Sequence, residues 1–127
     1  MARVLVVDDE LPLLNLMQRY LERLGYEVET CPDSQEALNR IIQDPLRFRL
    51  VVADLSMPQL SGRDMVVKIG EVNPEIAILV CSGEPFDCQT LPHARPERVN
   101  FLQKPFAAKM LAAAVAELLP SATATGA

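Results

Sequence analysis

The chain has 127 residues, which is enough for one domain with a hydrophobic core. Half of the residues are hydrophobic, a composition that favours a folded globule over a disordered chain. The 12 Lys and Arg residues against 17 Asp and Glu residues give a formal net charge of −5, and the basic residues are scattered, so we expect no direct binding to nucleic acid.

The first three predicted elements are a strand, a helix and a second strand. The apolar run RVLVV (3–7) predicts a buried strand. Apolar residues then recur at the spacing of one helical face: Leu14, Met17, Leu21 and Leu24. Pro12 fits the first turn of that helix, and Gly25 lies just past its end. The alternating segment YEVETC (26–31) predicts a second strand nearer to an edge of the sheet.

The next predicted elements are a second helix and a third strand. Segment 33–44 predicts a helix, because Asp33 and Glu36 have the spacing of a capping box. Its predicted buried face consists of Ala37, Leu38, Ile41 and Ile42. The segment LVVADL (50–55) predicts the third strand, which is apolar up to Asp54.

Two helices and two strands are predicted in the second half of the chain. A third helix is expected to begin near Ser61 or Gly62. The continuous apolar run IAILVC (76–81) is typical of a strand covered on both faces, and NFLQ (100–103) predicts a short fifth strand. The segment FAAKMLAAAVAELL (106–119) predicts the final helix. Three methionines at helical spacing with aliphatic residues are predicted to lie in the core: Met17, Met65 and Met110.

The alternation of strands and helices predicts an α/β fold with parallel strands and helices on both faces. We expect residues 1–119 to form one domain and residues 120–127 to form a flexible C-terminal tail. The pattern breaks at residues 83–99, where a fourth helix would be expected. Three prolines fall inside this segment: Pro85, Pro92 and Pro96. Because proline disfavours helical geometry, we expect the fourth helix to be shortened or replaced by a loop.

Polar side chains stand where the predicted strands end. Asp8 and Asp9 follow the first strand, and Asp54 closes the third. In a doubly wound sheet, ligands bind beyond the carboxyl ends of the strands, where the winding reverses. Clustered carboxylates repel one another unless a cation lies among them, and oxygen ligands suit magnesium or calcium. Ser82 and Lys104, at the ends of the next two strands, would line the same pocket.

This set of groups suits phosphoryl transfer to a carboxylate, with Asp54 as the nucleophile and the metal and Lys104 neutralising the phosphoryl oxygens. Four motifs carry these groups in chain order: DD (8–9), DLSMPQLSG (54–62), CSG (81–83) and KPF (104–106). On these motifs the sequence resembles the response-regulator receiver domain of bacterial two-component signalling, the CheY-like family. The resemblance extends from about residue 3 to residue 119.

The resemblance implies a flavodoxin-like, five-stranded parallel sheet with the strand order 2-1-3-4-5. It also implies a Mg²⁺ site formed by the carboxylates of Asp9 and Asp54 and the backbone carbonyl of Ser56, with Asp8 acting largely through water. Lys104 would contact the phosphoryl group, and Asp54 would be its acceptor.

The resemblance further implies a conformational switch. Ser82 would donate its hydroxyl to the phosphoryl group and move inward, and Phe101 occupies the position of the aromatic switch residue. The peptide bond before Pro105 is expected to be cis. Ser56 and Glu84 flank the pocket and would tune the lifetime of the phosphoryl group.

The resemblance thus implies a stoichiometric phosphoacceptor that catalyses its own phosphorylation and dephosphorylation. The phosphoryl donor would be a phosphohistidine on a sensor histidine kinase or a histidine phosphotransfer protein, and a partner protein would supply the output. We expect no membrane partner, because no apolar run reaches the length of a membrane span. We expect a cytoplasmic location with all three cysteines reduced: Cys31, Cys81 and Cys88.

Two other functions remain open. The fold could serve as a constitutive protein–protein interaction module, which the altered segment 83–99 would favour and the complete pocket argues against. It could also be a phosphohydrolase with an aspartyl nucleophile, although such enzymes carry a second acid two residues after the nucleophile, where this chain has Ser56. His93 stands alone between prolines and is interpreted as a solvated side chain.

Overall fold

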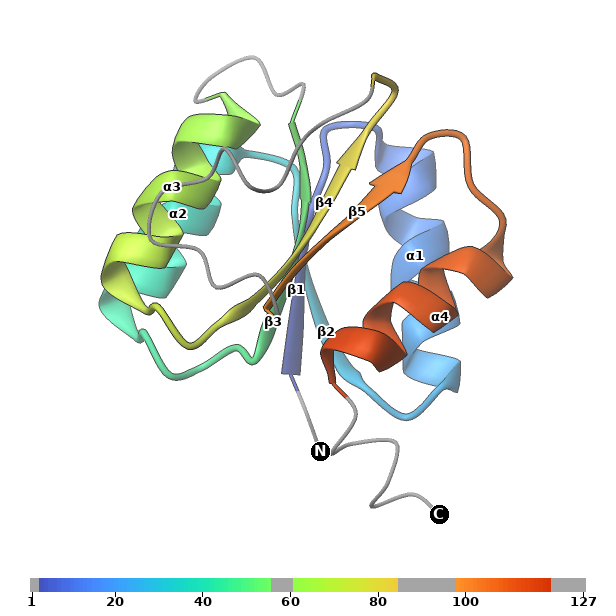
Figure 1. Cartoon of the computed structure of the whole chain (residues 1–127), viewed down its shortest axis with the longest axis horizontal. Helices are drawn as coiled ribbons and strands as arrows, with labels where there is room; N and C mark the ends of the chain where they lie inside the picture. The colour runs from blue at the N-terminus through green and yellow to red at the C-terminus, as the bar shows by residue number, and fades with distance from the viewer. Residues whose placement is uncertain (1–2, 56–60, 85–97, 120–127) are drawn as a thin grey trace.

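Five parallel strands form one sheet at the centre of the molecule (Figure 1). The structure is a computed structural model and describes residues 3–55, 61–84 and 98–119. The strands are β1 (Arg3–Val7), β2 (Glu27–Cys31), β3 (Leu50–Asp54), β4 (Ala77–Ser82) and β5 (Val99–Gln103). They pair in parallel in the order β2-β1-β3-β4-β5, which confirms the predicted sheet and places β2 at one edge.

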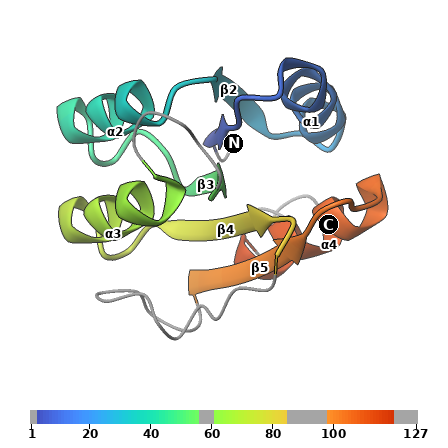
Figure 2. The same ribbon diagram turned by 90° about the horizontal axis from the view of Figure 1, so that it is seen from above.

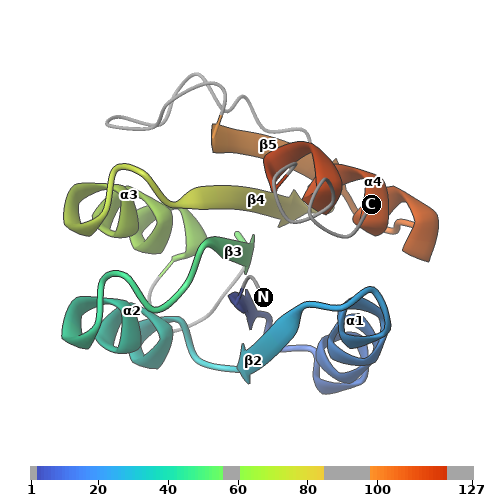
Figure 3. The same cartoon turned by 90° about the horizontal axis from the view of Figure 1, so that it is seen from below.

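In the described part of the chain, four helices cover the sheet, two on each face. They are α1 (Leu11–Arg23), α2 (Ser34–Gln43), α3 (Gly62–Val72) and α4 (Ala108–Leu118). Figure 2, which looks down on the molecule of Figure 1, shows α1 and α4 on one side of the sheet and α2 and α3 on the other. The opposite view in Figure 3 shows the same two layers. The winding reverses between β1 and β3, because the chain runs outward from β1 to β2 and then returns past β1 to β3.

The alternation of side chains along each strand divides the core into two clusters. Val4 and Val6 pack with α1 and α4, whereas Leu5 and Val7 pack with α2 and α3. All four residues are buried, because both faces of the sheet are covered. The continuous apolar run in β1 therefore reflects two buried faces and not a helix.

Local signals fix the ends of the helices as predicted. The Asp33 carboxylate accepts hydrogen bonds from the backbone N–H groups of Gln35 and Glu36 at the start of α2. The Ser61 hydroxyl accepts one from the N–H of Asp64 at the start of α3. Gly25 follows α1 with a φ of +100°, a conformation that favours glycine.

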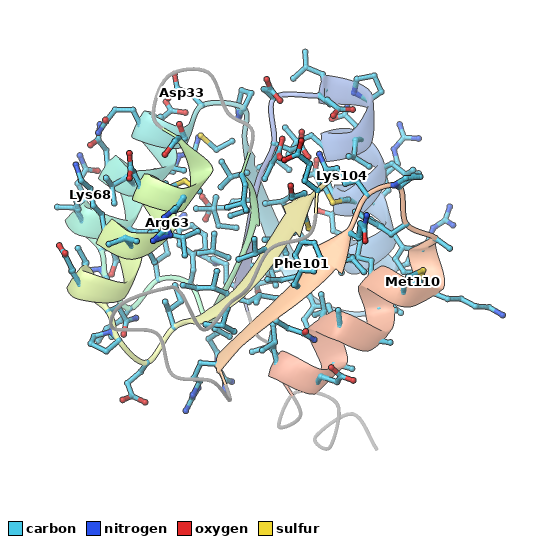
Figure 4. All side chains as sticks on the ribbon, turned by 45° about the horizontal axis from the view of Figure 1, so that its top comes forward. Asp33, Arg63, Lys68, Phe101, Lys104 and Met110 are labelled. Carbon is cyan, nitrogen blue, oxygen red and sulfur yellow. The ribbon has the colours of Figure 1, made fainter. Side chains whose placement is uncertain are left out.

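Two of the residues predicted to be buried are half exposed, Ile42 at 52% and Met110 at 50%. Leu24, the last residue of the apolar face predicted for the first helix, is 47% exposed. Ile42 lies next to the buried Ile41, at the margin of the face that α2 turns to the sheet. Met110 lies in the first turn of α4, and Figure 4 shows it on the outer side of that helix. In α2 and α4 the apolar arc is wider than the contact with the sheet, so periodicity alone overestimates the buried face.

The prediction of a shortened or missing fourth helix concerns residues 83–99, of which 85–97 lie outside the described part of the chain. The predicted tail at 120–127, together with Cys88 and His93, also lies outside it. Cys31 and Cys81 are buried free thiols. Within the described ranges, none of the helices combines the length and the apolar character needed to cross a membrane.

Candidate functional site

The carboxyl edge of the sheet brings together side chains that are far apart in the sequence. Asp8 follows β1, Asp54 is the last residue of β3, Ser82 is the last residue of β4 and Lys104 follows β5. The parallel register aligns these ends, since Asp54 pairs with Cys81 and Ser82 with Gln103. Figure 4 shows Lys104 at this edge, just beyond the end of β5.

The Lys104 ammonium lies among three carboxylates. Its Nζ is 2.8 Å from Oδ2 of Asp8, 3.4 Å from Oδ2 of Asp54 and 3.5 Å from Oε1 of Glu10. The side chains of Asp8 and Asp54 are only 2% and 4% exposed, whereas that of Glu10 is 63% exposed. The site thus has a buried floor formed by two aspartates and a solvent-facing rim at Glu10.

For both Asp8 and Lys104, burial shifts the pKa in one direction and the oppositely charged neighbours shift it in the other. Burial raises the pKa of Asp8, and the hydrogen bonds from Lys104 and from the N–H of Glu10 offset this only in part. Burial lowers the pKa of Lys104, but the hydrogen bond to Asp8 and the negative charges of Asp8, Asp54 and Glu10 outweigh it, so the net shift of the pKa is upward. Lys104 is therefore firmly protonated at neutral pH, and the pocket favours a positive charge.

Backbone hydrogen bonds hold the site residues in place. Oδ1 of Asp8 accepts a hydrogen bond of 2.9 Å from the N–H of Glu10. The N–H of Lys104 donates to the carbonyl of Ser82 at 2.8 Å, which ties the end of β5 to the end of β4. The Ser82 hydroxyl accepts a hydrogen bond from the N–H of Glu84 at 3.1 Å. The Lys104–Pro105 peptide bond is cis, the isomer expected from the resemblance.

The donor set of the pocket fits a hard divalent cation. Asp8, Glu10 and Asp54 each offer a carboxylate oxygen, and these oxygens lie within 4.8 Å of one another. Carboxylate oxygens at such spacing suit Mg²⁺ or Ca²⁺ better than they suit zinc. Asp9, which the resemblance places in the metal site, is exposed and does not belong to this group. Ser56, the predicted carbonyl ligand, lies outside the described residues.

Sequence reasoning did not assign Glu10 to the site. Its signal was the third consecutive acid in VLVVDDE, directly before the first turn of α1. The backbone at Glu10 is extended, with φ −84° and ψ 98°, and Oε1 of its carboxylate lies 3.5 Å from Nζ of Lys104. Phe101 is half-buried and packs against the cluster under α2 and α3.

Gly62 brings the start of α3 into direct contact with the end of β3. A Cβ atom at this position would lie 2.2 Å from the carbonyl oxygen of Asp54 and 2.3 Å from Cα of Leu55, both of them backbone atoms. The N–H of Gly62 donates to the carbonyl of Leu55 at 3.1 Å. Glycine is therefore required here by the close approach of two backbones, which positions the segment that carries Asp54.

Comparison with known proteins agrees with this geometry. The family model described as the response regulator receiver domain matches residues 4–116, which is most of the chain. The chain belongs to the response regulator receiver domain family. The match begins in β1, ends in α4 and includes Asp8, Asp54, Ser82 and Lys104.

Two curated relatives and one solved structure illustrate the relationship. The chain is 32% identical over 122 residues to the response regulator MprA of Mycolicibacterium vanbaalenii, covering 96% of this chain and 52% of MprA. It is 28% identical over 111 residues to the response regulator SaeR of Staphylococcus epidermidis, covering 87% of this chain and 47% of SaeR. This chain therefore spans about half the length of these relatives.

The solved structure of a response regulator receiver domain protein from Clostridium thermocellum superposes with a TM-score of 0.81 at 29% identity. The superposition covers 98% of this chain and 99% of that one. A receiver domain of the same extent is thus known as a folded unit, and this chain has the fold and the motif order of a two-component receiver.

Proposed function

We propose that this receiver domain takes a phosphoryl group on Asp54 from a phosphohistidine of a partner protein, a sensor histidine kinase or a histidine phosphotransfer protein. The observation that carries the proposal is the buried Asp54 carboxylate at the end of β3, 3.4 Å from the Lys104 ammonium. This lysine is held in place on the other side by Asp8 at 2.8 Å. A nucleophile and a fixed positive charge next to it are the groups that transfer of a phosphoryl group to a carboxylate requires.

The residues have distinct roles in the proposed reaction. An oxygen of Asp54 forms a bond to phosphorus while the P–N bond of the phosphohistidine breaks and the imidazole leaves with the electron pair. Lys104 neutralises charge on the phosphoryl oxygens. Mg²⁺, when bound at the carboxylates beside Lys104, supplies further positive charge next to those oxygens. Hydrolysis by water then releases phosphate and restores the Asp54 carboxylate.

The proposed metal site includes Asp9, Asp54 and the backbone carbonyl of Ser56, with Asp8 acting through water, as the resemblance implies. The described carboxylates of Asp8 and Asp54 support this, because their oxygens converge at a distance that suits an oxygen-bound cation.

The proposed switch involves Ser82 and Phe101. The Ser82 hydroxyl is engaged with the N–H of Glu84 at 3.1 Å, and Ser82 is only 6% exposed. A phosphoryl group on Asp54 offers strong acceptor oxygens at the end of the neighbouring strand, so the hydroxyl can turn to donate to it. Repacking of Phe101 would then change the surface presented to an effector protein, as a shift between two populated states.

The proposal is tested by incubating the protein with phosphoramidate, a small donor with a P–N bond, in the presence of Mg²⁺. The intact mass of the wild-type protein should increase by one phosphoryl group. Asp54→Asn should remain unmodified, and Asp64→Asn, which removes an exposed acid in the first turn of α3, should be modified as wild type. Equal modification of the Asp54→Asn variant would contradict the assignment of Asp54.

A further inference from the structure

Glu10 is the third acid of the run Asp8-Asp9-Glu10, and its position is fixed from both sides. Its N–H donates to Oδ1 of Asp8 at 2.9 Å, and its carbonyl accepts the first hydrogen bond of α1, from the N–H of Leu14, also at 2.9 Å. The backbone of Glu10 therefore cannot move away without breaking a part-buried hydrogen bond and the first hydrogen bond of α1. From this backbone position, the Glu10 side chain extends toward Asp8, Asp54 and Lys104.

The Glu10 carboxylate completes a triangle of oxygens with those of Asp8 and Asp54. One oxygen of each lies within 4.8 Å of the other two, and Oε1 of Glu10 is 3.5 Å from Nζ of Lys104. When all three acids are ionised, these carboxylates and the Lys104 ammonium together carry an excess of two negative charges. This excess matches the charge of a divalent cation.

Glu10 differs from the two aspartates in its access to solvent. Asp8 and Asp54 form the floor of the pocket at 2% and 4% exposure, and Oδ1 of Asp8 is already engaged by a backbone N–H. At 63% exposure, the Glu10 carboxylate loses little hydration when it turns from Lys104 to another cation. It is therefore the carboxylate of the three that can approach an entering hydrated ion from the solvent side.

We propose that Glu10 is a further carboxylate of the divalent-cation site, acting at its mouth and setting the affinity of the site for Mg²⁺. This inference rests on the proposed function, because it concerns the same metal site, and it adds a residue that the sequence motifs did not assign. The affinity of oxygen-ligand sites depends on the number of charged ligands. Loss of a carboxylate that contacts the ion or orients its water weakens binding by roughly tenfold.

The test is the dissociation constant for Mg²⁺, measured by isothermal titration calorimetry on the full chain at constant pH and ionic strength. Glu10→Gln keeps the size of the side chain and removes its charge, and should weaken Mg²⁺ binding by roughly tenfold. Glu22→Gln removes the same charge from an exposed position near the other end of α1 and should leave the dissociation constant within about twofold of wild type, as expected for a screened surface charge. Glu10→Asp keeps the charge but shortens the side chain, and should fall between Glu10→Gln and wild type.

Two outcomes would overturn the assignment of Glu10. The first is an equal weakening of Mg²⁺ binding by Glu22→Gln, which would indicate a long-range electrostatic effect of the whole protein. The second is wild-type affinity of Glu10→Gln, and Asp9→Asn is measured beside it: the metal site is then formed without Glu10 if Asp9→Asn abolishes binding. That result would leave the proposed function intact, because phosphorylation of Asp54 would still have its metal.

A wild-type protein that binds no Mg²⁺ and accepts no phosphoryl group would overturn both proposals. Circular dichroism melts in EDTA verify that each variant is folded.

Discussion

The Lys104 ammonium contacts the carboxylates of Asp8, Glu10 and Asp54. The pKa of Asp8 is raised, so the positive charge of Lys104 only partly offsets the effect of burial on that pKa. Because the pKa of Asp8 is raised, the folded protein binds the Asp8 proton more tightly than the unfolded chain does. The contribution of Asp8 to stability is thus greatest below its unfolded pKa and is lost as the pH rises through its folded pKa.

We therefore expect Asp8→Asn to be at least as stable as wild type in EDTA at pH 7, although it removes a hydrogen-bonded carboxylate. Urea unfolding should give an equal or higher midpoint for the variant, and the difference should shrink as the pH is lowered and Asp8 of the wild type takes up its proton. Saturating Mg²⁺ should stabilise wild type more than Asp8→Asn. A clearly lower midpoint for the variant at pH 7 in EDTA would mean that the ion pair with Lys104 outweighs burial.

At the scale of elements, the junction between β3 and α3 determines the position of Asp54. Ser61 caps the helix, and Gly62 packs its Cα directly on the backbone of Asp54 and Leu55. The first turn of α3 therefore acts as a support for the end of the strand. The motif DLSMPQLSG (54–62) includes this glycine, but only the structure shows which backbone atoms exclude a larger residue.

Gly62→Ala should destabilise the fold by about 2 to 3 kcal/mol, because the new methyl group would overlap with backbone atoms that cannot rotate away. Gly83→Ala is the matched control, since a Cβ there would meet nothing within 4 Å. Urea unfolding measures both. Phosphorylation by phosphoramidate should be slower for Gly62→Ala than for Gly83→Ala, because only the first substitution displaces Asp54. Equal stability of the two variants would show that the junction can relax around a methyl group.

Most of the element pattern could be predicted from the sequence, because buried parallel strands are continuous apolar runs and the helices carry clear start signals such as Asp33 and Ser61. The degree of burial was less predictable. Ile42 and Met110 have the periodicity of core residues, but they lie beyond the width of the helix–sheet contact, which depends on the tertiary packing.

The candidate site was predictable to a similar degree. Asp8, Asp54 and Lys104 meet as their positions at strand ends indicate, because parallel strands share one carboxyl edge. The place of Glu10 in the site could not be predicted, because it depends on the backbone conformation at Glu10 and on the rotamer of its side chain.

On the scale of the whole molecule, Cys31 and Cys81 report on the integrity of the two core layers. Cys81 belongs to the cluster under α1 and α4, and Cys31 to the cluster under α2 and α3. Burial raises the pKa of the Cys31 thiol to about 11 and that of Cys81 to about 12. At pH 8, roughly one Cys31 side chain in a thousand would be the reactive thiolate.

Iodoacetamide at pH 8 should therefore leave both cysteines unmodified in the native protein and alkylate both in urea. Peptide mass spectrometry measures the two sites separately. Raising the pH toward 11 under native conditions should increase the reaction at Cys31 before that at Cys81, because the pKa of Cys81 is higher. Rapid alkylation of Cys81 in the native protein at pH 8 would contradict the packed core.

The central claim is that Asp54 is the acceptor of the phosphoryl group. Borohydride reduces an aspartyl phosphate to homoserine, so treatment of the protein with phosphoramidate, Mg²⁺ and then borohydride marks the modified residue permanently. Peptide mass spectrometry should find homoserine at position 54 and at no other aspartate, and none in a sample prepared with EDTA. Homoserine at Asp8 or Asp9 in place of Asp54, or a protein that remains unreduced although its intact mass shows a phosphoryl group, would contradict the account.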